Sequence, residues 1–356
     1  MKKKINKIRQ YINGLRISRF RFWIQLISFF IFVYGGYFFI EIGSRLPIFS
    51  CPYVPGSPGG CYLLGVQHEL NSTWSSIFSP RGISILKSLG IFLAFFLVLN
   101  KAWCGFVCPL GTVQDWITKL RMAMGFSFTR YDQMSFKRLK VIKYILLFLL
   151  ILIPLAINNS FFGAPKLPHG MHTPFCQICP ARIILPLFNG DTSQIYIDFT
   201  DTTTIIMTSL GLMVAALFFV GSFVKKRFFC FFCPMSALHY IFSRFSFLRL
   251  EKDGSKCTRC GNCYRACDVG IIEIADDITS KNIVKDDCIM CFKCVEACPE
   301  DGALDIKFFN IPLYTASHEG FFKRYGVGDE NTKPINLDEL INSKEEKNDK
   351  NNRSQR

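Results

Sequence analysis

Long apolar stretches alternate with short basic segments over the first 250 residues of this chain. Four stretches approach the length of about 20 residues that an α-helix needs to cross a bilayer. They cover residues 22–40, 83–99, 141–157 and 204–224. The first is too long for the apolar part of a secretory signal peptide, and no small-residue cleavage site follows it. The pattern therefore predicts four transmembrane helices.

The distribution of Lys and Arg predicts how these helices are oriented. Residues 1–21 contain eight Lys or Arg and no acid, and residues 100–143 again contain eight. The segments 41–82 and 158–203 contain two each, and a basic run at 225–227 follows the fourth stretch. Because basic segments stay on the cytoplasmic side, we expect a multi-pass protein of a bacterial cytoplasmic (inner) membrane. Both the N- and the C-terminus are then cytoplasmic.

Composition supports a membrane domain joined to a soluble one. Apolar residues make up 50% of the 356 residues and charged residues 19%, and mean hydropathy is +0.24. A net charge of +15 is compatible with nucleic-acid binding. The basic residues lie beside apolar stretches, however, so we expect no nucleic-acid partner. We expect a basic cytoplasmic N-terminus (1–21), a four-span membrane domain (22–250), a Cys-rich domain (251–310) and a polar, disordered tail (311–356).

The Cys-rich domain contains two runs with the same spacing, C-x2-C-x2-C-x3-C. Two such runs are typical of a ferredoxin-like module with two [4Fe–4S] clusters, in which the fourth Cys of each run ligates the other cluster. Structural zinc is the alternative, but zinc usually takes two separate Cys pairs. Segments 271–275 and 282–284 predict a short β-hairpin. The predicted ligands are Cys257, Cys260, Cys263 and Cys298 for cluster one, and Cys288, Cys291, Cys294 and Cys267 for cluster two.

The residue after the fourth Cys differs between the two runs. Pro299 follows Cys298, whereas Asp268 follows Cys267, where such modules usually have Pro. This departure removes no ligand. We expect it to raise solvent access to cluster two or to alter its reduction potential.

The membrane domain contains an internal repeat with a period of 125 or 126 residues. Each half reads as a span, an outer loop with two Cys, a second span and an inner Cys pair ending in Cys-Pro. Amphipathic stretches follow at 110–120 and 235–245. Each Pro can begin a helix, whose N-terminus favours the negative charge of a thiolate or cluster. Buried cysteines that merely fill apolar space are the alternative. The inner set, a candidate metal site, is Cys104, Cys108, Cys230 and Cys233.

Four further cysteines lie on the predicted outer face. Two thiolates from each half of the repeat can hold one more cluster, whereas an oxidising compartment favours two disulfides, Cys51–Cys61 and Cys176–Cys179. Both possibilities stay open for Cys51, Cys61, Cys176 and Cys179. Three outer histidines can accept protons from a quinol or ligate a haem, or they are ordinary loop residues. They are His68, His169 and His172.

Over about residues 20–309, the order of four spans, two inner Cys-Pro motifs and a two-cluster module resembles the NapH-type membrane quinol dehydrogenase subunit. The membrane part of NosR and related polyferredoxins is similar. The resemblance implies electron transfer from membrane quinol toward periplasmic reductases, and it gives the inner cysteines a functional role. Two features depart from the NapH-type pattern. The second inner motif has two residues between its cysteines rather than three, and the outer four cysteines are not expected.

We therefore expect a mainly α membrane protein, with a four-helix transmembrane bundle of two repeated hairpins and a C-terminal α+β two-cluster ferredoxin-like module. Its cofactors are two [4Fe–4S] clusters, with one or two further clusters and a quinone as additional candidates. As an oxidoreductase component it would link the quinone pool to a periplasmic reductase, a cytochrome or another electron-transfer subunit. The alternatives are ferredoxin-to-quinone transfer, an assembly or regulatory polyferredoxin for a copper or other metalloenzyme, and a merely anchored ferredoxin.

Overall fold

The computed structural model describes residues 15–38, 80–126, 133–158, 176, 178–195, 199 and 202–325. Contacts divide the chain into two compact units. We call residues 21–246 the helical unit, and residues 1–20 together with 247–356 the cysteine-rich unit. The two correspond broadly to the membrane domain and the Cys-rich domain predicted from the sequence.

Each predicted apolar stretch coincides with a long helix. The four helices are α2 (Ile17–Tyr34), α4 (Pro80–Leu99), α6 (Gln133–Asn158) and α9 (Thr202–Val224). Helix α2 ends before the predicted boundary at residue 40, and a 3₁₀ turn, η1 (Gly35–Phe38), follows it. Two consecutive glycines explain the early end, since glycine is a poor helix former.

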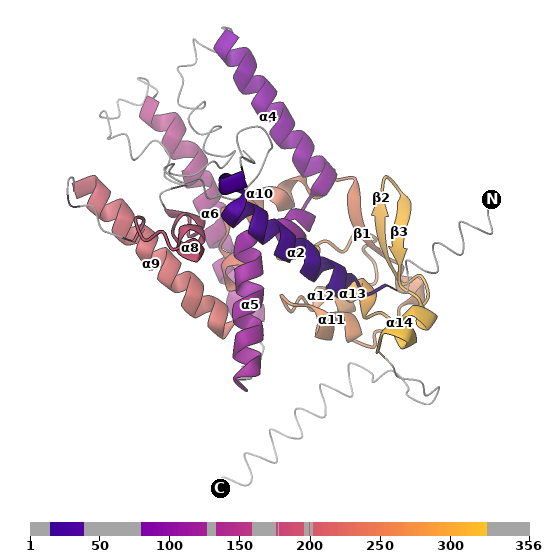
Figure 1. Ribbon diagram of the computed structural model, residues 1–356. Helices are drawn as coiled ribbons and strands as arrows, with labels where there is room; N and C mark the ends of the chain where they lie inside the picture. The colour runs from indigo at the N-terminus through magenta and orange to yellow at the C-terminus, as the bar shows by residue number, and fades with distance from the viewer. Residues whose placement is uncertain are drawn as a thin grey trace. The chain divides into compact units, whose positions relative to one another are not determined.

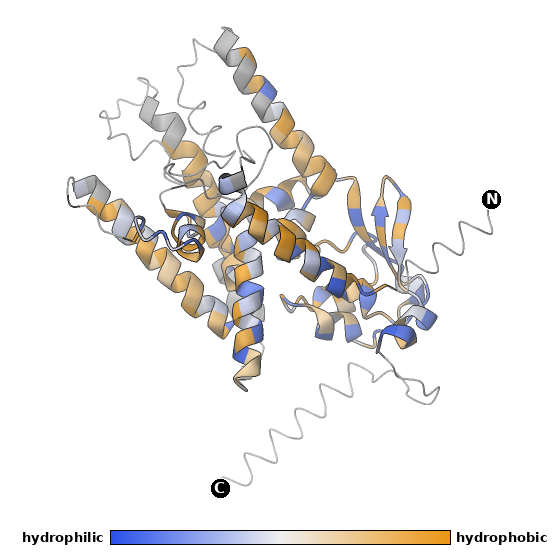
Figure 2. Ribbon diagram, in the orientation of Figure 1, coloured by the Kyte–Doolittle hydropathy of each residue, from blue (hydrophilic) through white to orange (hydrophobic). Residues whose placement is uncertain are grey.

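Helices α2 and α9 contain the described segments best suited to a membrane. Within the described part of the chain, Ile17–Tyr34 and Ile205–Val224 are long and apolar enough to cross a bilayer, judged by length and composition alone. Gly90–Leu99 of α4 is a shorter apolar helix. Figure 2 shows the hydrophobic colouring along α4 and α9.

Short helices follow both inner Cys-Pro pairs. Helix α5 (Pro109–Ala123) and helix α10 (Pro234–Phe242) each have Pro in the first turn and Cys at the N-cap. The amphipathic stretches predicted at 110–120 and 235–245 are thus confirmed as helices, although α10 ends three residues early. A π-helical turn, η3 (Trp103–Val107), precedes α5, and a 3₁₀ turn, η6 (Phe228–Phe231), precedes α10.

The core of the helical unit joins segments from both halves of the predicted repeat. Helices α2, α5, α8 (Ala181–Phe188) and α9 meet around Phe29, Leu110, Ile184 and Phe218. Helices α4 and α10 form a second cluster around Phe92, Phe96 and Met235. Both clusters pack against cysteines of the inner set, Cys108 in the first and Cys233 in the second.

The cysteine-rich unit is built on an antiparallel sheet of order β1-β2-β3 (Figure 1). Leu248 pairs with Phe308 at one end of β1, and Lys252 pairs with Leu304 at the other. Short helical segments and one C-terminal helix accompany the sheet. The elements are β1 (Leu248–Lys252), η7 (Gly254–Lys256), α11 (Asn262–Ala266), α12 (Glu273–Asp276), α13 (Lys293–Glu296), β2 (Leu304–Phe308), β3 (Ile311–Thr315) and α14 (His318–Tyr325).

The predicted β-hairpin over 271–275 and 282–284 is wrong. Residues of its first arm form helix α12, and Asn282 pairs with Glu251 instead. Lys252 explains the helix, because its Nζ donates hydrogen bonds to the carbonyl oxygens of Ile274 (2.8 Å) and Ala275 (2.9 Å). Asp277 then closes the turn by accepting from the backbone N–H groups of the two residues that follow Ile278.

The predicted disordered tail begins too early. Residues 311–325 contain strand β3 and helix α14. Tyr314 of β3 is buried, and its hydroxyl accepts a hydrogen bond from Arg324 at 2.8 Å. Arg324 also donates to the carbonyl oxygen of Glu296 at 2.7 Å. The polar composition of this segment gave no sign of these buried contacts of Tyr314 and Arg324. Residues 326–356 lie outside the described part.

Candidate functional site

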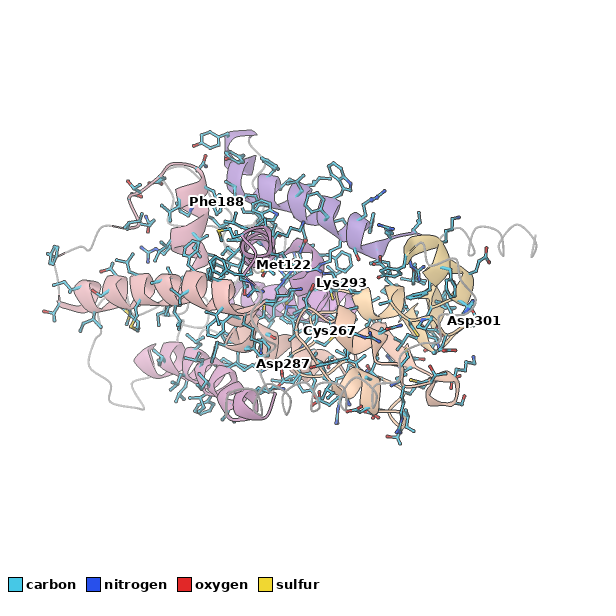
Figure 3. All side chains as sticks on the ribbon, turned by 90° about the horizontal axis from the view of Figure 1, so that it is seen from below. Met122, Phe188, Cys267, Asp287, Lys293 and Asp301 are labelled. Atoms are coloured by element: carbon cyan, nitrogen blue, oxygen red, sulfur yellow. The ribbon has the colours of Figure 1, made fainter. Side chains whose placement is uncertain are left out.

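The eight cysteines of the cysteine-rich unit surround two separate cavities. Cavity one has an empty volume of about 340 Å³, and its thiols are Cys257, Cys260, Cys263 and Cys298. Cavity two has an empty volume of about 310 Å³, and its thiols are Cys267, Cys288, Cys291 and Cys294. The fold thus brings together each set of four that the spacing assigns to one cluster; Cys267 is labelled in Figure 3.

The first three cysteines of each run lie in loops of the same backbone geometry. Arg259 and Gly261 adopt positive φ angles of 56° and 73° in the first loop. Met290 and Phe292 adopt 48° and 60° at the matching positions of the second. Left-handed conformations are rare for residues with a side chain. Their repetition at equivalent positions shows that the surrounding contacts fix both loops, which turns the thiols inward.

Burial raises the pKa of these thiols, so they stay protonated unless a bound cation stabilises the thiolate. It raises the pKa of Cys298 to about 12 and that of Cys294 well above its ordinary value of 9.0. Neighbouring thiols raise the pKa of Cys294 further. Burial likewise raises the pKa of Cys263 to about 12, against an opposing effect of Lys252. A bound metal reverses this balance, because it deprotonates a coordinating thiol.

Backbone donors also point at the sulfur atoms. The N–H of Met290 donates to Cys288 Sγ at 3.4 Å. The backbone of Val269, Gly270 and Ile271 lowers the pKa of the Cys267 thiol by hydrogen bonding, although burial outweighs it and raises that pKa to about 11. Such donors stabilise negative charge on a cluster. Burial, four converging thiols and N–H donors together fit an iron–sulfur cluster.

Asp268, which follows Cys267, is itself shielded from solvent. Its side chain is only 6% exposed and pairs with Lys293 at 2.7 Å. The two predicted effects, raised solvent access to cluster two or an altered reduction potential, both stay predictions.

The four inner cysteines of the helical unit come together, although the pair Cys104 and Cys108 is more than 120 residues from the pair Cys230 and Cys233 in sequence. Burial is the main cause that raises the pKa of Cys104 well above its ordinary value, and the thiols of Cys108, Cys230 and Cys233 add to it. Cys108 accepts from the backbone N–H of Gly111. Burial raises the pKa of Cys233 to about 12, against an opposing hydrogen bond from the backbone of Ser236. Two helix N-termini therefore face this group of thiols.

A buried ion network holds the loop that carries Cys104. Asp115 of α5 accepts from Arg21 at 2.6 Å and from Arg227 at 2.8 and 2.6 Å. Arg227 also donates to the carbonyl oxygen of Cys104 at 2.9 Å, and Arg21 donates to that of Gly105 at 2.8 Å. Two guanidinium groups share one carboxylate, so the network carries a net positive charge beside the thiols.

Gln114 connects the two halves of the inner site. Its Nε2 donates to Cys230 Sγ at 3.7 Å, and its Oε1 accepts from the backbone N–H of Phe229 at 3.0 Å. The side chain is buried. Gln114, Asp115 and Arg227 were not among the site residues predicted from the sequence. The available signal was Asp115, an acid in a segment dominated by Lys and Arg.

The outer set is only partly described. Cys176 and Cys179 carry half-buried thiols, and Cys179 packs against the core around Phe29. The positions of Cys51 and Cys61, and of His68, His169 and His172, lie outside the described residues. Across the described ranges, no three His, Cys, Asp or Glu side chains are grouped so that they would hold a single metal ion. The choice between a cluster and disulfides thus stays a prediction.

Family comparisons identify both cysteine-containing regions. Residues 249–299 match a 4Fe-4S dicluster domain. Residues 82–127 and 207–250 each match a 4Fe-4S binding domain, once in each half of the predicted repeat. With the cysteine-lined cavities, these matches define an iron–sulfur electron-transfer protein.

Individual relatives extend this assignment. The chain is 22% identical to the ferredoxin-type protein NapH of Escherichia coli, over 62% of this chain and 67% of that protein. It is 25% identical to YccM, named as an electron transport protein of the same organism, over 65% of this chain and 57% of that protein. An uncharacterized protein of Methanocaldococcus jannaschii is 28% identical over 63% of this chain and 71% of its own. No solved structure matches. The chain is thus similar to NapH-type polyferredoxins, as predicted.

Proposed function

We propose that this chain is a membrane-bound electron-transfer protein that passes electrons between the quinone pool and a periplasmic reductase or cytochrome. The similarity to the ferredoxin-type protein NapH and to YccM supports the electron-transfer role. The alternation of segments rich in Lys and Arg with segments poor in them supports an inner-membrane location with both termini in the cytoplasm.

The side chains on the long helices also support a membrane location. Phe30 of α2, Phe148 of α6 and Val220 of α9 are more than half exposed. Soluble monomers rarely expose large contiguous apolar patches, because contact of such patches with water is unfavourable. Lipid contact removes this penalty.

Two clusters are held in the cysteine-rich unit under this proposal. Cys257, Cys260, Cys263 and Cys298 hold cluster one, and Cys288, Cys291, Cys294 and Cys267 hold cluster two. The single observation that carries the proposal is the pair of separate cavities, each ringed by four buried or half-buried thiols. When bound, the clusters supply one-electron transfer. The chain lines the cavities with mostly buried thiols and directs N–H groups at sulfur atoms of cavity two.

A third cluster is held by the inner set, Cys104, Cys108, Cys230 and Cys233. The mutual proximity of these thiols and the two helix N-termini beside them support this site. The net positive charge of the Arg21–Asp115–Arg227 network favours the negative charge of a cluster with four thiolates. Quinol would then be oxidised within the apolar helices, near this site.

Reduction by quinol tests the proposal. Anaerobically purified protein in phospholipid vesicles is mixed with a short-chain quinol, and cluster reduction is followed by EPR spectroscopy. We expect rapid reduction by quinol. If dithionite reduces the clusters but quinol does not, then the proposed quinol activity is wrong and the electron-transfer assignment remains.

The Cys104→Ser variant separates the proposed role of the inner site from mere anchoring. We expect quinol to reduce the clusters of the cysteine-rich unit much more slowly in this variant, while dithionite reduces them normally. Unchanged reduction by quinol would mean that the helical unit serves only as an anchor.

A further inference from the structure

The two cavities of the cysteine-rich unit differ in the residues that complete their walls. Besides its four cysteines, cavity two is lined only by apolar residues, among them Leu250, Ile274 and Phe292. Cavity one is lined by three charged residues, which are Lys252, Arg259 and Glu300. The two runs of cysteines have identical spacing, so the spacing alone does not reveal this difference.

Lys252 is the charge in cavity one with the least access to solvent. The residue is 5% exposed, and its Nζ donates to the carbonyl oxygens of Ile274 and Ala275 at 2.8 and 2.9 Å. These bonds to neutral groups fix the ammonium group but leave its charge in place. Arg259 is exposed and Glu300 is half-buried. These two residues carry opposite charges, and solvent screens them more than it screens Lys252.

Beside cavity two lies a lysine whose charge is paired with a carboxylate. Lys293 immediately precedes Cys294, and Asp268 immediately follows Cys267. Lys293 Nζ lies 2.8 Å from Asp268 Oδ1 and 2.7 Å from Oδ2, and the carboxylate is 6% exposed (Figure 3 labels Cys267 and Lys293). The equivalent positions around cavity one are Asn262 and Pro299, which are uncharged.

Electrostatics predicts how this asymmetry acts on reduction. One electron enters a [4Fe–4S] cluster and adds one negative charge, with no bond made or broken. A fixed cation nearby stabilises the added charge. An apolar wall destabilises it, because burial of charge in an apolar medium is unfavourable. Net charge and solvent exposure are established determinants of cluster potential.

We propose that cluster one has the higher reduction potential, raised by Lys252, and that cluster two is the low-potential site, held in an apolar cavity and flanked by the neutral Asp268–Lys293 pair. At equilibrium, a single electron that enters the cysteine-rich unit therefore resides mainly on cluster one. This inference rests on the proposed binding of one cluster in each cavity.

A redox titration of the full-length protein followed by EPR tests this order, with dithionite as reductant. We expect two one-electron steps for the clusters of this unit. Their reduction potentials should differ by about 59 mV or more, which corresponds to a tenfold difference in the ratio of reduced to oxidised cluster. The Lys252→Met variant should lower only the higher step. Since this variant also removes two hydrogen bonds, the Asp268–Lys293 pair provides a second test: Lys293→Gln should lower only the lower step, and Asp268→Asn should raise only the lower step.

The outcomes separate this inference from the proposed function. Opposite shifts of the same low-potential step in Lys293→Gln and Asp268→Asn support the inference, because a purely structural role would not reverse sign. Coincident steps in the wild type, or a shift of the lower step in Lys252→Met, overturn it while the cluster assignment stands. Absence of [4Fe–4S] signals from the wild-type protein overturns the proposed function itself.

Discussion

The cysteine-rich unit and the helical unit each gather cysteine thiols in the interior, but they position them by different means. In the cysteine-rich unit, three ligands of each set lie within seven residues of sequence, and tight loops with left-handed backbone aim them inward. In the helical unit, two Cys pairs approach from segments more than 100 residues apart. There a half-buried carboxylate with two buried arginines fixes the loop around Cys104.

This difference determines which substitutions each site tolerates. Local loops keep their shape through backbone conformation, so a single side chain away from the cysteines matters less. A site assembled from distant segments depends on the side chains that join them, and loss of one partner removes bonds between those segments. The helical unit should therefore be the more sensitive of the two to changes outside its cysteines.

The largest effect is expected for Arg227→Leu. The guanidinium is buried, and its loss removes bonds to Asp115 and to the carbonyl oxygen of Cys104. Asp115 keeps Arg21 as a partner, so the loss is that of charged hydrogen bonds, worth about 1.5–3 kcal/mol each. We expect the free energy of unfolding of the helical unit to fall by this amount, measured by thermal unfolding in detergent, together with loss of iron from the inner site.

Lys281→Ala is the control, because that side chain is 78% exposed and its pair with Glu251 spans 3.8 Å. Equal effects of both variants would contradict a central role of the network.

Three glycine substitutions sharpen the comparison. A Cβ at Gly111 would overlap with the Arg227 guanidinium, and one at Gly254 would overlap with the carbonyl oxygen of Ile278. Overpacking costs about 1–3 kcal/mol. We expect Gly111→Ala to impair the inner site and Gly254→Ala to impair the cysteine-rich unit, each read by its own EPR signal. At Gly90 a Cβ meets nothing within 4 Å, so Gly90→Ala should be neutral or slightly stabilising. Loss of the same signal in both impaired variants would show that the units do not act separately.

His239 should make the stability of the helical unit depend on pH. Burial, aided by Lys101, lowers the pKa of this α10 residue from 6.5 to about 3. Between these values the unfolded chain binds a proton that the folded chain does not. The free energy of unfolding therefore falls, as pH drops below 6.5, by up to about 1.4 kcal/mol per pH unit. Melting temperatures at pH 7.5 and 5.5 measure the effect. His239→Phe keeps an aromatic ring beside Phe96 and should reduce the pH dependence; an unchanged dependence would exclude His239 as its source.

The smallest effect is expected for Gln114→Leu. It removes the donor to Cys230 Sγ, and hydrogen bonds to sulfur raise cluster potential. A hydrogen bond of about 1 kcal/mol corresponds to roughly 40 mV for a one-electron couple. We expect the inner cluster to shift down by about this amount in a redox titration. Thr118→Val, one turn further along α5, is the control, because the Thr118 hydroxyl donates only to the backbone of Gln114. A shift in the control alone would contradict the role of Gln114.

The helices and the sets of cysteines could be predicted from the sequence better than the contacts that hold them in place. Apolar stretches and Cys-Pro pairs are local signals, and α4, α5, α9 and α10 lie where these signals indicate. Helix α12 could not be anticipated, since a lysine in strand β1 caps it.

The ordered part of the predicted tail and the inner network were missed for a related reason. Tyr314 and Arg324 lie in a polar segment, and only their mutual contact reveals the anchor. Asp115, Arg21 and Arg227 are ordinary charges in the sequence and become a network only when three distant segments meet. Contacts between residues far apart in sequence leave no pattern in the residues around either partner, so they cannot be predicted from the sequence alone.

The number of irons that depend on the inner cysteines is the most direct test of the account. Iron and acid-labile sulfide are measured per chain on anaerobically purified wild type and on a Cys104→Ser/Cys230→Ser double variant. We predict about four fewer irons in the variant, since one cubane holds four, with the EPR signals of the cysteine-rich unit intact. Equal iron content in the two proteins would contradict a cluster at the inner site and leave the electron path of this chain confined to the cysteine-rich unit.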